Sequence, residues 1–98
     1  MSAISKEQID EALTSLPGWS REGDGEAIVK TYDFADFRAA MDFMQRASGP
    51  IEEMDHHPDW TNIYDKVEIR LTSHDADGVT ARDVRLAKVL DRVAAATS

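Results

Sequence analysis

The chain begins with apolar residues at helical spacing. They follow a capping-box pattern, in which Ser5 precedes Gln8 by three residues. Pro17-Gly18 then predicts the end of this first helix. The apolar residues that indicate the helix are Ile9, Ala12, Leu13 and Leu16.

Two short runs with strand character come next, residues 19–22 and 27–32. Gly23-Asp24-Gly25 separates them, and glycine supplies the positive φ that a tight connection needs. This arrangement predicts a β-hairpin.

A second stripe at helical spacing follows the hairpin, and Asp33 is predicted as its N-cap. Gly49-Pro50 interrupts the pattern, because proline lacks a backbone N–H and disfavours helical geometry at the preceding residue. We expect a kink or break after Ala47, with helical turns resuming toward Met54. The apolar stripe consists of Phe34, Phe37, Met41 and Met44.

The segment 60–73 alternates apolar and polar residues, but the alternation changes phase near Asp65-Lys66. One long strand would leave this change unexplained, whereas a two-residue turn at Asp65-Lys66 repairs it. We therefore predict a second hairpin in which Tyr64 lies opposite Val67, with the large residues of both strands on one face. The opposite face would carry Thr61, Glu68 and Arg70.

The last apolar stripe predicts a final helix after a loop at residues 74–78. Thr80, with Asp83 three residues later, is its expected capping box. The order αββαββα favours an α+β fold: one domain, residues 1–98, with a four-stranded antiparallel sheet covered by helices on one face. The helix is indicated by Val84, Leu86, Ala87, Leu90, Val93 and Ala94.

Composition narrows the functional classes. Among 98 residues, 11 Lys and Arg oppose 19 Asp and Glu, giving a net charge of −8 that disfavours nucleic acid as a partner. The absence of cysteine excludes disulfides and thiolate chemistry. The longest hydrophobic run is residues 93–96, so we expect no membrane span or signal-peptide core, and a cytoplasmic protein.

The three histidines are the candidate chemical groups: His56, His57 and His74. Neighbouring carboxylates favour the imidazolium form and can orient the ring, which suits acid–base catalysis near neutral pH. Glu52 lies four residues before His56, so a hydrogen bond between them is expected if that turn is helical. The stretch between Arg46 and Lys66 has no basic residue and contains Glu52, Glu53, Asp55, Asp59 and Asp65.

Other interpretations of these residues remain open. Two adjacent histidines in an acidic loop are often simply surface residues. A three-histidine metal site is conceivable, although side chains of adjacent residues diverge and no His-x-His or His-x-x-x-His spacing occurs. Trp60 and Tyr64 could stack on a flat ligand or pack on the sheet.

A longer pattern resembles the signature of the pterin-4a-carbinolamine dehydratases. It combines residues 52–60, an acidic stretch with His-His-Pro and an aromatic residue, with Thr72-Ser73-His74 and Arg82-Asp83. The resemblance implies the αββαββα fold. It also implies dehydration of 4a-hydroxytetrahydrobiopterin to quinonoid dihydrobiopterin and water, which recycles the cofactor of aromatic amino-acid hydroxylases.

The same resemblance implies roles for individual residues. His56 and His74 would form the acid–base pair, and His57 would bind and orient the substrate. The resemblance implies no metal or cofactor, and it implies assembly as dimers or tetramers. The further residues that would border the pterin are Asp55, Thr72, Ser73 and Asp75, and the supporting residues would be Glu52, Trp60 and Asp83.

Relatives within this family also act as binding modules. One class is a dimerisation cofactor for a transcription factor, and another assists assembly of a carbon-fixing enzyme. A non-catalytic interaction module is therefore the alternative function, although the three histidines in register favour the enzyme.

Overall fold

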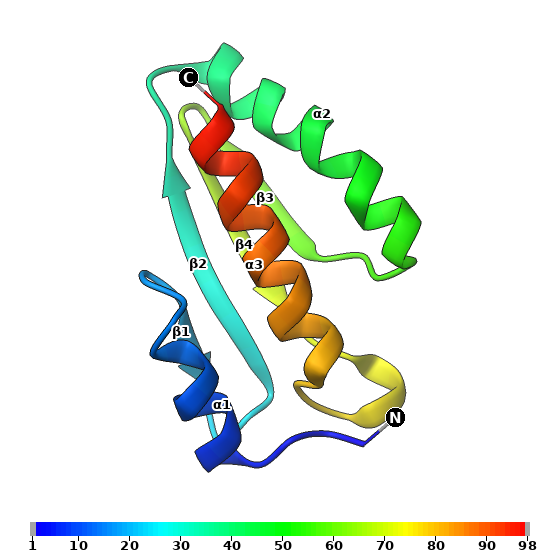
Figure 1. The fold of residues 1–98 in the computed structure, drawn as a ribbon. Coiled ribbons are helices and arrows are strands. Elements are labelled where there is room, and N and C mark those ends of the chain that lie inside the picture. Colours follow the sequence, from blue (N-terminus) through cyan, green and yellow to red (C-terminus); the bar gives the residue numbers. More distant parts are fainter. Residues whose placement is uncertain (1, 98) are drawn as a thin grey trace.

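The computed structural model describes residues 2–97 as a sheet with helices on one side (Figure 1). The predicted order αββαββα is confirmed, with a short 3-10 helix, η1, added between β4 and α3. No helix in the described range is long and apolar enough to cross a membrane. The elements are α1 Lys6–Leu13, β1 Ser20–Glu22, β2 Ala27–Asp33, α2 Phe37–Met54, β3 Asp59–Ile63, β4 Lys66–Leu71, η1 His74–Ala76 and α3 Ala81–Ala96.

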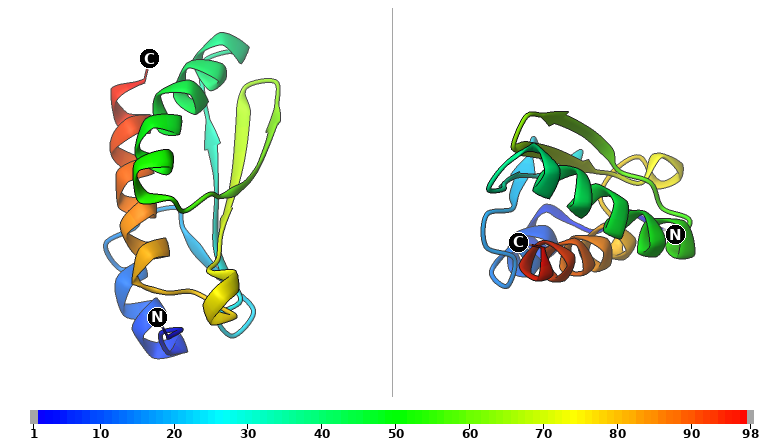
Figure 2. Two further views of the ribbon diagram at one scale, coloured as in Figure 1. Left: turned by 90° about the vertical axis from the view of Figure 1, so that its right-hand side faces the viewer. Right: turned by 90° about the horizontal axis from the view of Figure 1, so that it is seen from above.

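The four strands form one antiparallel sheet in the order β1-β2-β4-β3. The central pair joins β2 to β4, with Ile28 opposite Leu71 and Tyr32 opposite Val67. The helices cover one face and leave the other open, as Figure 2 shows in its left view. The α+β architecture predicted from the sequence is therefore confirmed.

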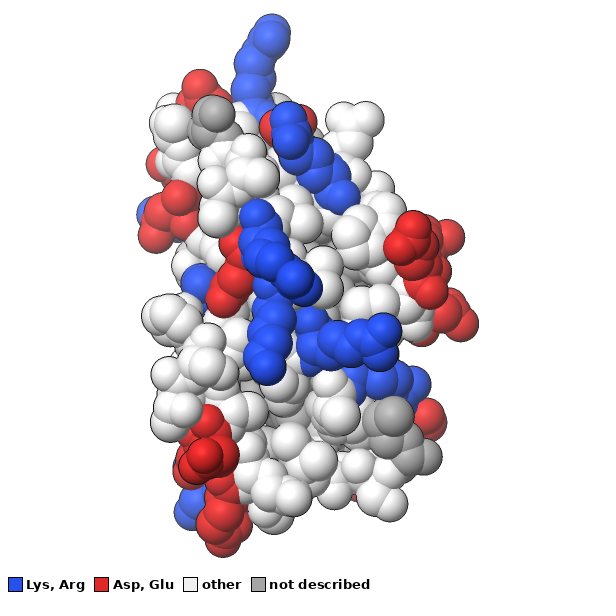
Figure 3. Space-filling view, viewed as in Figure 1, with Lys and Arg blue, Asp and Glu red and all other residues white. Residues whose placement is uncertain are grey.

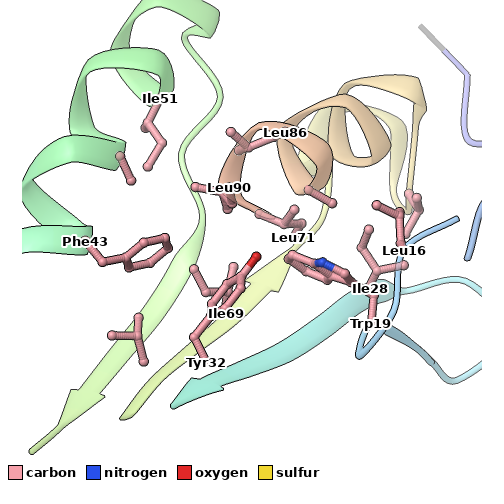
Figure 4. Packing of buried hydrophobic residues seen from close by; sticks show 14 of the residues in the cluster. Leu16, Trp19, Ile28, Tyr32, Phe43, Ile51, Ile69, Leu71, Leu86 and Leu90 are labelled. Carbon is pink, nitrogen blue, oxygen red and sulfur yellow. The ribbon is translucent and has the colours of Figure 1, made fainter. Parts of the chain in front are cut away.

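The core fills the space between the helices and the covered face of the sheet (Figure 4). Phe43 from α2 and Leu90 from α3 are fully buried there, and Ile69 of β4 reaches them from the sheet. Tyr32 and Phe34 each lie 5.0 Å from the Phe43 ring between centroids. The apolar stripes found in the sequence thus point to one common core.

The helix caps confirm two predictions and correct a third. Ser5 and Thr80 cap α1 and α3 in capping boxes, as expected. The N-cap of α2 is Asp36, whose carboxylate accepts a 2.9 Å hydrogen bond from the backbone N–H of Ala39, so the prediction of Asp33 is wrong. Asp33 is the last residue of β2 and pairs with Lys66 of β4. The strand therefore continues through the residue at which the helix was expected to begin.

The prediction of a kink or break at Gly49-Pro50 is wrong in its stronger form, because α2 runs unbroken through Pro50 to Met54. Proline normally clashes with the Cβ and N–H of the residue before it. Gly49 has no Cβ, so the Cβ part of this clash is absent; beyond the local helix, nothing lies within 4 Å of the place where a Cβ would be added. The Gly-Pro pair therefore relieves part of the clash that would otherwise end the helix.

The second hairpin exists, but its turn lies one residue earlier than predicted. Tyr64 and Asp65 form the turn, Ile63 lies opposite Lys66, and Asn62 instead of Tyr64 faces Val67. This register differs from the prediction by two residues along β3. A shift of two keeps every side chain on its predicted face, because the strand period is two.

A polar cluster joins α3 to β2 and to the residue just before β1. One carboxylate oxygen of Asp91 accepts hydrogen bonds from Trp19 Nε1 at 3.0 Å, Lys30 Nζ at 2.9 Å and Tyr32 Oη at 2.5 Å. Burial and the contact with Asp91 raise the pKa of Tyr32, so its hydroxyl stays protonated and donates. The cluster ties α3 to β2 and to Trp19.

Candidate active site

The candidate site lies at the end of the sheet where β3 begins and β4 ends. These two points coincide because the strands are antiparallel neighbours. Asp55 ends α2 in the left-handed conformation, with φ 49° and ψ 44°, which aspartate tolerates better than most residues. His56 and His57 follow directly in the connection to β3, and His74 starts η1 just beyond β4.

His56 forms a buried pair with a carboxylate of α3. Its Nε2 lies 2.5 Å from Oδ1 of Asp83; His56 is 7% exposed and Asp83 is fully buried. A carboxylate at this distance fixes the ring orientation and favours the proton on Nε2. Asp83, a candidate supporting residue from the sequence, thus lies in contact with His56.

His57 forms the second pair, on the surface. Its Nε2 lies 2.6 Å from Oε1 of Glu52, and both side chains are largely exposed. The expected bond from Glu52 to His56 is therefore wrong. That bond assumed a continuing helix, but the left-handed Asp55 turns the chain and sends His56 toward α3 instead.

His74 is exposed at the start of η1 and borders a pocket of about 180 Å³. Thr72 also lines this pocket, and its hydroxyl donates a 2.6 Å hydrogen bond to the backbone carbonyl of Glu26. Neither His56 nor His57 lines the pocket. The remaining lining residues are Glu26, Arg70, Asp77 and Gly78.

Ser73 connects the segment after β4 to the first turn of α3. Its buried hydroxyl lies 2.8 Å from Oδ2 of Asp83 and 2.8 Å from Oγ1 of Thr80. The Asp83 that contacts His56 is thus also tied to the residue that precedes His74. This shared carboxylate brings the two histidine-bearing segments into one structural unit.

Asp75 makes an ion pair at the edge of the site, with Arg82 Nη2 2.6 Å from its Oδ1. The Arg82 guanidinium lowers the pKa of the Asp75 carboxyl. The pair joins η1 to the start of α3 and keeps Asp75 ionised at neutral pH.

The two aromatic candidates for ligand stacking, Trp60 and Tyr64, lie in different environments. Trp60 is half-buried and packs against the core, whereas Tyr64 is 64% exposed in the hairpin turn. A wider hollow of about 720 Å³ on the strands is lined by Trp60 and Asp59 but by none of the three histidines. Within residues 2–97, no group of three or more His, Asp or Glu side chains is placed to hold a metal ion.

Thr80 is the site residue that the sequence did not assign to the site. The capping-box pattern revealed its backbone role, but its buried hydroxyl also contacts Ser73. Only the fold brings β4 and the start of α3 close enough for this contact. Sequence spacing alone carries no signal for it.

The fold and the site together define a small α+β protein with paired histidines and carboxylates at one end of an open sheet. A family model described as pterin 4 alpha carbinolamine dehydratase matches residues 2–93. The chain belongs to this family.

Individual relatives agree with the family model. A provisionally named pterin-4-alpha-carbinolamine dehydratase of Afipia carboxidovorans is 48% identical over 92 residues, which cover 94% of this chain and 92% of that protein. A protein of Rhodopseudomonas palustris with the same provisional name is 47% identical over 95 residues, which cover 97% and 94%.

Two solved structures share the fold. A protein described as a transcriptional coactivator/pterin dehydratase of Brucella melitensis has a TM-score of 0.91 and 35% identity, covering 95% of this chain and 99% of that one. A pterin dehydratase-like protein described as a RuBisCO assembly factor in the alpha-carboxysome has a TM-score of 0.68 and 19% identity, covering 79% and 89%. The second likeness concerns the fold alone.

Proposed function

We propose that the protein is a 4a-hydroxytetrahydropterin dehydratase, with 4a-hydroxytetrahydrobiopterin as the representative substrate. The observation that carries the proposal is the pairing of His56 with buried Asp83 and of His57 with Glu52, in a chain of this family. Such pairs orient imidazoles for proton transfer near neutral pH.

The reaction removes water across two neighbouring ring atoms. The N5–H bond breaks, its electron pair forms the C4a=N5 double bond, and the C4a–O bond breaks as the hydroxyl accepts a proton and leaves as water. One group must therefore accept a proton and another must donate one. We assign these roles to His56 and His74, and substrate orientation to His57.

Further residues would contact or support the substrate. Asp55 and Asp75 lie at the two exposed edges of the site, where their carboxylates can accept hydrogen bonds from pterin N–H groups. Thr72 would border the ring from the end of β4, and the buried Ser73 would support the site beside it. Glu52 holds the ring of His57, and Trp60 supports the site by packing beneath the start of β3.

The biological setting is part of the proposal. We infer a cytoplasmic homodimer or homotetramer that recycles a reduced pterin for an aromatic amino-acid hydroxylase. The family resemblance and the exposed strand β3 at a sheet edge support self-association. Sedimentation equilibrium of the purified protein measures the oligomeric state directly, and a monomer would refute that part.

The deciding experiment follows freshly generated 4a-hydroxytetrahydropterin by stopped-flow ultraviolet absorbance with and without the protein. We expect acceleration over the spontaneous dehydration, and a rate unchanged by the protein rejects the proposal. His74→Ala should remove most of the acceleration without altering the circular dichroism spectrum. Gln45→Ala, an exposed change on α2, is the matched control and should retain the full rate.

A second candidate function is a non-catalytic interaction module. It is favoured by two exposed apolar residues on α2, Phe37 and Met41, and by a band of basic side chains on the helix face seen in Figure 3. This function predicts that replacing all three histidines leaves a partner bound in a pull-down, while Phe37→Ser releases it. Loss of the partner in the histidine variant would contradict it.

A further inference from the structure

A chain of buried hydrogen bonds lies behind His56. Oδ2 of Asp83 is 2.8 Å from Ser73 Oγ and 2.9 Å from the backbone N–H of Thr80. Ser73 Oγ is in turn 2.8 Å from Thr80 Oγ1, which accepts a 3.2 Å hydrogen bond from the backbone N–H of Arg82. Ser73, Thr80 and Asp83 are each at most 1% exposed, so water does not substitute for these bonds.

The available protons allow only one donor-to-acceptor direction along this series of hydrogen bonds. An ionised Asp83 only accepts, so the single hydroxyl proton of Ser73 points to Oδ2. The contact between the two hydroxyls must then use the proton of Thr80, which donates to Ser73 Oγ. The bonds therefore run from Arg82 N–H through Thr80 and Ser73 to Asp83, and bonds aligned in this way strengthen one another.

The backbone of Ser73 is also engaged internally. Its N–H donates to the carbonyl of Gly78 at 3.0 Å, and its carbonyl accepts from the N–H groups of Ala76 and Gly78. Neither the hydroxyl nor the main chain of Ser73 is left free for a ligand. This placement differs from a substrate contact and agrees with a residue that acts through its neighbours.

The second ring nitrogen of His56, Nδ1, bears on the tautomer of the ring. It has no hydrogen bond to the residues described. If Nδ1 were fully buried, it would be a buried polar atom without a partner, but Arg82 Nε is the only such side-chain atom among those residues. Nδ1 of His56 therefore keeps contact with solvent. With Nε2–H donated to Asp83, Nδ1 is the acceptor that the neutral ring offers to the site.

We infer that Ser73 and Thr80 are positioning residues, whose hydroxyl chain holds the side chain at position 83 in one orientation and thereby fixes which group meets Nε2 of His56 and which tautomer His56 adopts. The hydroxyl of Ser73 and the backbone N–H of Thr80 both donate to the Oδ2 position, so an acceptor oxygen must occupy it. The other oxygen of Asp83 is then committed to His56. The kinetic part of this inference rests on the proposed function; the tautomer does not.

The sharpest test is Asp83→Asn, read by two-bond ¹H–¹⁵N correlation spectra of ¹⁵N-histidine-labelled protein. The two donors should hold the amide oxygen at the Oδ2 position, which turns the amide NH₂ toward His56. Because Nε2 must then accept, the neutral ring should change from the Nε2–H to the Nδ1–H tautomer. A His56 signal that keeps the Nε2–H pattern in Asp83→Asn overturns the inference.

Ser73→Ala tests the hydroxyl itself, with Ser15→Ala as control because that hydroxyl is exposed and bonds only the carbonyl of Ala12. We expect Ser73→Ala to shift the His56 Nε2 resonance and to lower kcat by about 10-fold with KM unchanged. A raised KM with unchanged kcat would instead show a substrate contact and refute the positioning role.

Thr80 supplies a pair of variants that separates the hydroxyl from the fold. Thr80→Ser keeps the donor and should retain the wild-type His56 spectrum, whereas Thr80→Val keeps the shape and should reproduce the effect of Ser73→Ala. Identical spectra for the two variants would contradict the hydroxyl chain. If wild-type protein does not accelerate dehydration, the proposed function fails, but the spectra still decide the tautomer.

Discussion

Removing the carboxylate of Asp91 should destabilise the protein strongly, although Asp91 lies outside the histidine site. Asp91→Ala leaves three donors, two from β2 and one from the residue before β1, without their common acceptor: Lys30 Nζ, Tyr32 Oη and Trp19 Nε1. A hydrogen bond to a charged group contributes about 1.5–3 kcal/mol. The Lys30 and Asp91 side chains are 18% and 25% exposed, so water compensates part of the loss.

We therefore expect Asp91→Ala to lower the free energy of unfolding by about 3 kcal/mol, less than the sum of three full bonds. For a domain of this size, that loss corresponds to a fall in Tm of roughly 12–24 °C. Urea denaturation followed by circular dichroism measures the free energy. The exposed ion pair of Asp33 with Lys66 supplies the control, and Asp33→Ala should cost less than about 1 kcal/mol.

A double-mutant cycle assigns the loss to the contact. Tyr32→Phe removes one of the three donors, so its effect should be smaller by about 1 kcal/mol in the Asp91→Ala background than in the wild type. If Asp91→Ala costs no more than Asp33→Ala, or if the cycle shows no coupling, the cluster does not anchor α3 as described.

Two further predictions concern stability. The ion pair with Arg82 lowers the pKa of Asp75 below its ordinary value of 3.8. The stability that the pair contributes is therefore present above that pH and is lost as the pH falls through the lowered pKa. The difference in unfolding free energy between wild type and Asp75→Asn should shrink over that range, and a constant difference would refute the pairing. Gly49→Ala should stabilise α2 by about 0.5–1 kcal/mol in a Pro50→Ala background, because no atom beyond the local helix lies near the new Cβ. Beside Pro50 the gain should be lost, because a Cβ on the residue before a proline clashes with the proline ring in helical geometry. Equal effects in both backgrounds, measured by urea denaturation, would disprove this account.

Local patterns predicted the elements well because each depends on neighbours in the sequence. The capping boxes at Ser5 and Thr80 fixed the starts of α1 and α3, and the glycines after β1 indicated the first turn. Errors arose where a distant segment decided the outcome. Asp33 continues as strand because β4 pairs with it. The error at Gly49-Pro50 was local instead, because a glycine before the proline relieves part of the clash that was expected to end the helix.

The site shows the same division. The three histidines and the acidic stretch were visible in the sequence, and Asp83 was among its candidate residues. The pairing itself was not, because the left-handed Asp55 exchanges the partners that helical spacing predicts: Glu52 meets His57, and His56 meets Asp83. The strand order β1-β2-β4-β3 and the contact between Ser73 and Thr80 likewise required the three-dimensional arrangement.

The central strand pair has a consequence for how the protein acquires its site. β2 and β4 are joined to each other through the whole of α2 and β3, so the middle of the sheet closes only when distant parts of the chain meet. Contacts of this kind form slowly compared with helices and local hairpins. Ser73 and His74 follow shortly after β4, and the contacts of Asp83 with Ser73 and His56 join this segment to the end of α2 in the closed sheet. For the proposed dehydratase, turnover should therefore return late in refolding, and its return would time the closure of the central pair.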